Sequence, residues 1–273
     1  MDLSGAEVVA ERRILFFTLH KCASMFIHRV CTDLARISGR AYFSPNGGDF
    51  QVSLQEMVTS VGFWQAHKAG CFGPLRLFIE IPEMEHDRIL LHLRDPRDVL
   101  VSMYYSYCFS HGGEISGGTG YRKEVAERGI DEFVLKLATA EERPVAGDYG
   151  TGSHVWEIAG NMRQRYFNYM RHLLDGQLRN VALVRYEDMI GDLEGWLEKV
   201  AAQFDVSEPA TIRQLAGQYR PAFDRTGENE WTHVRKVTPG DHLEKLRPET
   251  IAQLDRIFGE VLDTLGYRRA AAG

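Results

Sequence analysis

The sequence is poor in cysteine and has no long hydrophobic run. Its cysteines form no CxxC pair and have no histidine nearby at the spacing of zinc ligands, so we expect reduced thiols and no metal site; they are Cys22, Cys31, Cys71 and Cys108. No stretch approaches about 18 consecutive apolar residues, and the polar start MDLSGAEVVAERR lacks the features of a secretory signal. These absences predict a cytoplasmic protein without stable membrane insertion.

An excess of positive charge is also missing. The 273-residue chain has 32 Lys and Arg against 38 Asp and Glu, a formal net charge of −6. This balance creates no overall field that attracts nucleic acid, so we expect no nucleic-acid partner, and any anion must bind at a local basic cluster. With 44% hydrophobic residues the chain can bury a full core. We expect one domain over residues 1–273; the sequence indicates no particular oligomeric state.

Two segments predict a strand that runs directly into a helix. Residues 13–18 (RILFFT) form a continuous apolar run, typical of a buried parallel strand, and precede a helix expected over about 24–38. Residues 88–94 (RILLHLR) precede a helix expected over Pro96–Phe109, with Asp95 as its N-cap.

A third unit starts with residues 180–185 (NVALVR), followed by a loop over Tyr186–Gly191 and a helix from Leu193. Outer helices are expected over about 153–175 and 248–265. Periodicity places apolar residues on the inner face of two helices: Phe26, Val30, Leu34 and Ile37 in the first unit, and Leu193, Trp196, Leu197, Val200, Ala201 and Phe204 in the third. The pattern predicts an α/β fold with a central parallel β-sheet flanked by helices and with ligands at the carboxyl ends of its strands.

The loop after the first predicted strand has the features of a phosphate site. Small residues and a hydroxyl stand at a helix N-terminus beside Lys21, so free N–H groups, the helix dipole, Ser24 and the ammonium all favour an anion. The alternative is an ordinary turn with a solvated lysine. The loop is not a Walker A motif, because GxxxxGK[ST] is absent.

Two further positions follow predicted strands. Arg94 ends the second strand, and Ser102 lies two turns into the next helix, so the two can converge on one anion; alternatively, Arg94 pairs with Asp95 or Asp98. Tyr186 follows the third strand, where it can contact a base or simply pack in the core.

Taken together, these three sites resemble the sulfotransferase family that uses 3′-phosphoadenosine 5′-phosphosulfate (PAPS). The family's loop of the type PKSGTTW is similar to His20–Phe26, its run RNPKDVAVSYY is similar to Arg94–Tyr105 (RDPRDVLVSMYY), and its YED motif is similar to Tyr186–Asp188. The likeness extends over about residues 12–246. It implies the P-loop NTPase-like sulfotransferase fold, PAPS as donor, PAP as product, and no metal.

The resemblance also assigns residues to the donor. It places Lys21, Cys22, Ala23, Ser24, Met25 and Phe26 at the 5′-phosphosulfate, Arg94 and Ser102 at the 3′-phosphate, and Tyr186 at the base. A family loop of the type RKGxxGDW is similar to Arg235–His242, with Val237 in place of glycine and His242 in place of tryptophan, so Arg235 and Lys236 are expected at the 3′-phosphate. The competing match is Arg225–Gly227.

Catalytic roles follow from the same resemblance. Lys21 is expected to neutralise charge on the departing phosphate, because in-line transfer leaves charge on the bridging oxygen. The base that takes the acceptor's proton is a histidine in some members, and His67 is the candidate here; where members use a glutamate, Glu80 or Glu56 is the alternative.

The acceptor is the least defined part of the prediction. We expect its pocket in about residues 42–73 and 110–152, and the second stretch, rich in Gly, Ser and charge, is expected to be a mobile cover. A hydroxyl or amine of a small molecule, lipid or glycan remains open as acceptor. The alternatives to a sulfotransferase are a P-loop kinase and a non-catalytic PAP-binding module.

Overall fold

The computed structural model describes residues 12–45, 50–53, 56–57, 60–110, 118–139, 161–223 and 237–269. The chain divides into two compact units. The first comprises Met1–Leu93 and Gly176–Gln218, and the second comprises Arg94–Asp175 and Tyr219–Gly273. None of the helices in the described part of the chain is both long enough and apolar enough to cross a membrane.

The first unit is built on a parallel β-sheet, which confirms the predicted fold class. Six strands lie in the order β3-β2-β4-β1-β5-β6, and every neighbouring pair is parallel. Their bounds are β1 Arg13–Phe17, β2 Tyr42–Ser44, β3 Phe50–Gln51, β4 Gly70–Leu75, β5 Arg88–Leu93 and β6 Val181–Arg185. All carboxyl ends therefore meet at one edge, as expected for the loops after β1, β5 and β6.

The central strand β1 shows why its sequence forms a strand. Ile14, Leu15, Phe16 and Phe17 are completely buried, because a parallel strand with neighbours on both sides and helices above and below has no solvent-facing side. Ile14 pairs with Cys71 of β4 on one side and with Arg88 of β5 on the other.

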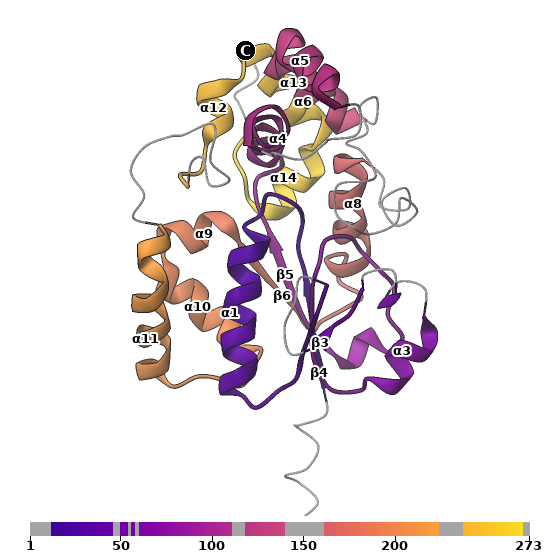
Figure 1. Cartoon of the computed structure of the whole chain (residues 1–273), viewed down its shortest axis with the longest axis vertical. Coiled ribbons are helices and arrows are strands. Elements are labelled where there is room, and N and C mark those ends of the chain that lie inside the picture. The colour runs from indigo at the N-terminus through magenta and orange to yellow at the C-terminus, as the bar shows by residue number, and fades with distance from the viewer. Residues whose placement is uncertain are drawn as a thin grey trace, which may run out of the picture. The chain divides into compact units, whose positions relative to one another are not determined.

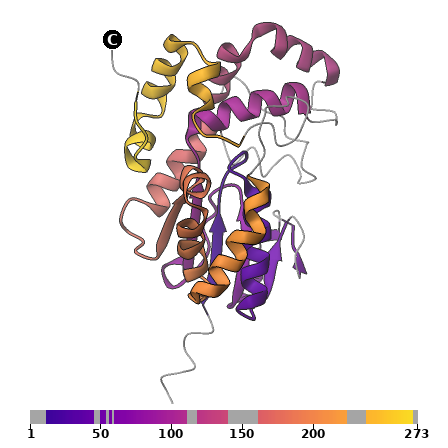
Figure 2. The same cartoon turned by 90° about the vertical axis from the view of Figure 1, so that its left-hand side faces the viewer.

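Helices flank this sheet on both faces. They are α1 Ser24–Ile37, α3 Val61–Ala66, α9 Tyr186–Gly191, α10 Leu193–Ala202 and α11 Pro209–Tyr219, with the 3-10 turn η2 at Met84–His86. Figures 1 and 2 show α1 and α11 on one side of the sheet and α3 on the other. The predicted loop at 186–191 is thus a short helix, and the predicted inner face of α10 is confirmed.

The orientation of α1 differs from the prediction. Phe26 is only partly buried and Ile37 is 49% exposed. The buried face consists instead of Ser24, Ile27, Val30, Cys31, Leu34 and Ala35. The helix is turned so that Cys31 and small residues, which the apolar pattern did not count, pack against the sheet.

The regular structure in the described residues of the second unit is all helical. Its elements are α4 Pro96–Tyr105, the π-helical turn η3 Ser106–Ser110, α5 Gly118–Arg128, α6 Ile130–Thr139, α8 Met162–Leu173, η4 Arg220–Ala222, α12 Asp241–Lys245, α13 Pro248–Ile257 and α14 Gly259–Leu265. Helix α6 packs against α4, α8 and α13, and α14 packs against α8 and α13.

Several predicted boundaries in this unit change. Helix α8 begins at Met162, because Asn161 caps it by accepting the N–H of Gln164 at 2.8 Å; residues 153–160 lie outside the described part. The helix expected over 248–265 is divided at Phe258, whose ψ of 11° departs from the helical value while its ring is buried.

Part of the expected cover over 110–152 is regular structure. Residues 118–128 and 130–139 form α5 and α6, with Phe133, Val134 and Leu137 buried. Residues 111–117 and 140–152 lie outside the described part. The stretch 42–73, where part of the acceptor pocket is expected, contains β2, β3, α3 and the start of β4.

Candidate active site

The loop between β1 and α1 has an alternating backbone. Lys21 (φ 64°) and Ala23 (φ 57°, ψ 31°) are left-handed, while Cys22 between them is not. Such residues carry a cost of order 1 kcal/mol each when they are not glycine, and they collect at ligand sites. Alternation of this kind turns successive N–H groups toward one concavity that suits an anion.

Three N–H groups at the start of α1 make no hydrogen bond within the described residues. Ala23 caps α1 through its carbonyl, which accepts from the N–H groups of Phe26 at 2.9 Å and Ile27 at 3.1 Å. Across the described residues, no hydrogen bond is recorded for the N–H groups of Ala23, Ser24 and Met25. Together with the positive end of a 14-residue helix, they give this loop the donors that an anion site requires.

Two cations lie beside these N–H groups. Burial, and then the charge of Arg76, lower the pKa of Lys21 to about 8. Arg76 directly follows β4, and its guanidinium lies 3.3 Å from the sulfur of Met25. The two like charges repel each other, and an anion bound beside both would relieve the repulsion.

Arg76 is a candidate site residue that the sequence analysis did not select. It follows the segment GCFGPL, whose two glycines and proline hid a fully buried strand. Its place in the sequence could have indicated it, because a cation follows an apolar segment directly and lies between the first and second predicted phosphate sites.

The second unit contains the Arg94–Ser102 motif. Asp95 caps α4 by accepting the N–H of Arg97 at 2.9 Å, as predicted. Arg94 is buried and its guanidinium lies 3.5 Å from Asp98. Ser102, one turn beyond Asp98 on the same helix, is partly exposed.

Asp98 connects this motif to a distant loop. Its carboxylate accepts from the backbone N–H groups of Gly240 at 2.7 Å and His242 at 3.0 Å, and its Oδ1 lies 2.6 Å from Nδ1 of His242. Burial alone would raise the pKa of Asp98, but the hydrogen bonds from His242 and the charge of Arg94 outweigh it and hold that pKa well below its ordinary range. Asp98 is therefore a fixed anion that holds residues 240–242 beside Arg94.

This contact favours one of the two loops proposed from sequence. Gly240 and His242 belong to the match Arg235–His242 and lie at the motif. Arg235 and Lys236 themselves lie outside the described residues, as does the competing Arg225–Gly227.

The structure does not bring His67 to the same edge as Lys21. His67 precedes β4, whereas Lys21 follows β1, and the two strands are parallel with Arg13 opposite Gly70. Six residues of β4 span about 20 Å, so His67 lies at the opposite edge of the sheet. Its Nδ1 lies 2.8 Å from the carbonyl of Phe63, and its ring stacks on that residue at 4.4 Å, which is a packing role.

The remaining predicted site residues differ in how far they are exposed to solvent. Glu56 and Glu80 are exposed, and Glu80 lies in the connection after β4. Tyr186 lies at the carboxyl end of β6 as predicted, with only 5% of its surface exposed. Cys22, Cys31 and Cys71 are buried, Cys108 is partly buried, and none of the four forms a disulfide.

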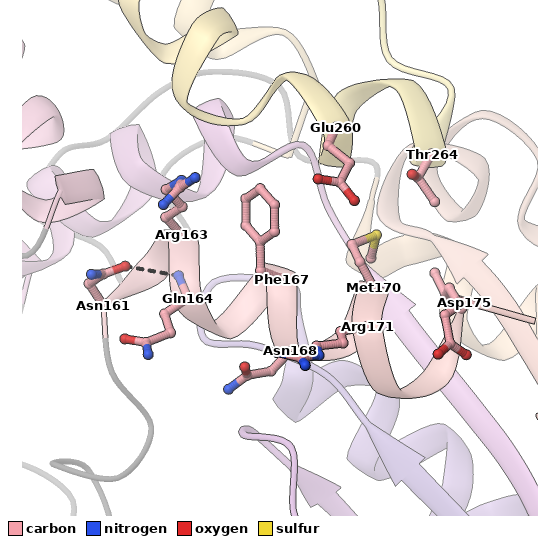
Figure 3. Close-up of a pocket in the computed structure, with 11 residues that line it drawn as sticks. Asn161, Arg163, Gln164, Phe167, Asn168, Met170, Arg171, Asp175, Glu260 and Thr264 are labelled. Carbon is pink, nitrogen blue, oxygen red and sulfur yellow. Dashed lines mark hydrogen bonds between the residues drawn. The ribbon is translucent and has the colours of Figure 1, made fainter. Parts of the chain in front are cut away.

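A groove of about 730 Å³ lies between α8 and α14 in the second unit. Figure 3 shows Phe167 standing in it, with the guanidinium of Arg163 4.6 Å from the ring. None of the predicted site residues lines this groove. Within the described ranges, no group of three or more His, Cys, Asp or Glu is arranged to hold a metal ion.

Residues 82–266 match the family model described as "Sulfotransferase domain". The chain belongs to the sulfotransferase family. The match covers well over half of the sequence and includes Arg94, Ser102, Tyr186 and the loop ending at His242, so the predicted enzyme class is confirmed. A search of curated proteins found no match for this sulfotransferase.

Solved structures agree on its fold. The mouse sulfotransferase SULT7A1 complexed with PAP has a TM-score of 0.58 at 17% identity, covering 93% of this chain and 85% of that one. Retinol dehydratase with retinol and PAP has a TM-score of 0.51 at 12% identity, covering 96% and 84%. The same enzyme with androsterone and inactive cofactor PAP gives 0.51 at 13%, covering 92% and 80%. The predicted sulfotransferase fold is thereby confirmed.

Proposed function

We propose that this sulfotransferase moves a sulfuryl group from PAPS to an acceptor hydroxyl or amine and releases PAP. The observation that carries the proposal is the loop after β1, where three unpartnered N–H groups meet Lys21 and Arg76. A site with N–H donors and two cations suits the doubly charged phosphosulfate end of the donor. The PAP-bound structures of related fold support the same donor.

Lys21 supplies the charge that the transfer step needs. A pKa of about 8 makes its ammonium a better proton donor than an ordinary lysine, while the group is still largely protonated at neutral pH. Negative charge develops on the oxygen between sulfur and phosphorus as that bond breaks. Lys21 donates to this oxygen, and the N–H groups of Ala23, Ser24 and Met25 hold the remaining phosphate oxygens. Cys22 and Phe26 complete the loop.

Arg94 and Ser102 are proposed to bind the 3′-phosphate, together with Arg235 and Lys236. Asp98 supports this role because it fixes both the Arg94 guanidinium and the backbone of residues 240–242. Tyr186 is proposed to contact the adenine base. Recognition of the 3′-phosphate is what would separate PAPS from ATP.

The proposed acceptor is a small molecule with an accessible hydroxyl. Retinol dehydratase was solved with retinol and with androsterone, which are both largely apolar alcohols. A lipid or glycan acceptor and a cytoplasmic location remain predictions from the sequence.

Calorimetric binding of PAP, ADP and ATP without magnesium tests the donor assignment. We expect PAP to bind most tightly, and Lys21→Ala and Arg94→Ala to weaken it at least tenfold, whereas Lys199→Ala and Arg256→Ala, two exposed cations on α10 and α13, leave it unchanged. Arg94→Lys, which keeps the charge, separates lost binding from lost folding. PAP binding no better than ADP, or ATP binding that requires magnesium, would replace the sulfotransferase assignment with the kinase alternative.

A further inference from the structure

A histidine without an assigned role lies at the same sheet edge as Lys21. His28 is four residues after Ser24 on α1, so the two share one face of the helix. Side chains of a helix lean toward its N-terminus, which directs the His28 ring back toward the loop. The charge of Arg76 lowers the pKa of both Lys21 and His28, so both groups lie within the field of one guanidinium.

The two ring nitrogens of His28 have different surroundings. Nδ1 lies 3.0 Å from the hydroxyl of Tyr42 and 3.3 Å from that of Ser44, both on β2. The imidazole also packs against the Tyr42 ring at 5.4 Å. For Nε2 no partner is recorded among the described residues, and the side chain is partly exposed. One nitrogen is therefore held by the sheet, while the other makes no hydrogen bond within the described part of the chain.

The groups around the ring favour its neutral form. Burial, and then Arg76 at the end of β4, lower the pKa of His28, while burial raises the pKa of Tyr42 well above its ordinary value. At neutral pH the imidazole is uncharged, and the Tyr42 phenol keeps its proton. If Nδ1–H donates to the oxygen of Tyr42 or Ser44, Nε2 carries the lone pair.

We propose that His28 is the general base that takes the proton of the acceptor. The proposal rests on the proposed function. As the acceptor oxygen forms its bond to sulfur, its O–H proton passes to Nε2, and the bond between sulfur and the 5′-phosphate oxygen breaks. The electron pair of that bond leaves with PAP, whose new charge Lys21 neutralises. The imidazolium then returns its proton to solvent.

This assignment replaces His67 by a residue at the correct edge of the sheet. His28 stands one turn from three unpartnered N–H groups, whereas His67 is about a strand length away. Proton transfer by a positioned side chain contributes about 100-fold to 10,000-fold to a rate. A role of this size is measurable with a simple acceptor.

The first experiment measures the tautomer of His28 in the free protein. Nitrogen-15 labelled histidine gives separate signals for protonated and unprotonated ring nitrogens, and His28→Gln identifies the signal. We expect Nδ1 to carry the proton and Nε2 to be bare. A proton on Nε2 of the neutral ring would overturn the proposal, because that nitrogen could not accept another.

The second experiment compares two acceptors in the presence of PAPS. para-Cresol must lose its proton during transfer, whereas para-nitrophenol is largely ionised at mildly alkaline pH. We expect His28→Gln to lower kcat by about 100-fold or more with para-cresol and far less with para-nitrophenol. An equal loss with both would mean a structural role. His86→Gln, with a side chain 77% exposed, is the control and should change neither rate.

PAP binding separates this proposal from the one on which it rests. His28→Gln should bind PAP as wild type does, since the N–H groups, Lys21 and Arg76 are unchanged. If wild type itself fails to bind PAP, the proposed donor is wrong. If wild type binds PAP but Nε2 carries the proton, or His28→Gln lowers kcat equally with both phenols, the donor assignment stands and His28 is not the base.

Discussion

Replacing Asp98 by asparagine removes the anion that joins the Arg94 motif to residues 240–242. The carboxylate accepts two backbone N–H groups and the Nδ1 proton of His242, and it lies 3.5 Å from Arg94. An asparagine has one oxygen for these donors and directs its own NH₂ group at the others. The shape is kept, but buried donors lose their partner.

The cost can be estimated from those contacts. A hydrogen bond to a charged group contributes about 1.5–3 kcal/mol, and leaving a buried ion pair with one partner costs about 3–5 kcal/mol. Because the contacts share one carboxylate, they do not add, and we expect Asp98→Asn to lower the free energy of unfolding by about 3–5 kcal/mol. This corresponds to a fall in Tm of roughly 10 °C.

Asp131→Asn is the matched control. Asp131 also accepts one backbone N–H, that of Arg247 at 3.0 Å, and lies 3.1 Å from its guanidinium, but Arg247 is exposed. Exposed pairs contribute at most about 1 kcal/mol. Thermal and denaturant unfolding of the two variants, with PAP affinity measured alongside, gives the comparison. If Asp98→Asn is as mild as Asp131→Asn, the proposed support of the 3′-phosphate site by Asp98 fails.

The pH dependence of that difference is a second readout. Since the folded pKa of Asp98 is held below its ordinary range, its carboxylate stabilises the fold fully above the pKa of an unfolded aspartate, about 3.9. The contribution declines as the pH falls below this value. Wild type and Asp98→Asn should therefore differ by a constant amount from mildly acidic to neutral pH and converge in stronger acid.

Two further predictions concern the loop after β1. Lys21→Met should abolish transfer yet raise Tm at neutral pH, because the folded pKa of Lys21, about 8, lies below that of an unfolded lysine and the folded state therefore disfavours its charge. Differential scanning calorimetry from pH 7 upward should show that this gain in Tm vanishes above about pH 10. A lower Tm of Lys21→Met at neutral pH would contradict the burial argument. Ala23→Gly should stabilise the protein by about 1 kcal/mol in urea unfolding, because glycine adopts the left-handed φ of 57° without strain. Ala35→Gly, inside α1, should be destabilising. If both variants change the free energy of unfolding in the same direction, the backbone of Ala23 is not strained.

The sequence was most informative where a local pattern decides the structure. Strand β1 and the capped start of α4 follow from an apolar run and from Asp95-Pro96, and each is formed by residues next to one another. Lys21 and Arg94 were proposed for the same reason, since each lies in the loop that follows such a strand.

Contacts between distant residues could not be derived in this way. Asp98 and His242 are 144 residues apart, and nothing in either segment indicates their hydrogen bond. His67 was selected from its interval in the sequence, which does not reveal at which end of β4 it lies. His28 was hidden because its partners, Tyr42 and Ser44, belong to a three-residue strand that the apolar pattern did not predict.

The left-handed residues of the loop have a consequence for how this site tolerates change. The anion would be held by main-chain N–H groups, so the side chains at positions 23 and 25, which are not buried, are free to differ from those of relatives as long as the backbone path is kept. Position 23 should accept glycine and asparagine, which adopt positive φ readily and carry no charge, and reject valine, isoleucine and proline. A saturation library at this position, selected for PAP binding, would thus be sorted by backbone preference and not by polarity.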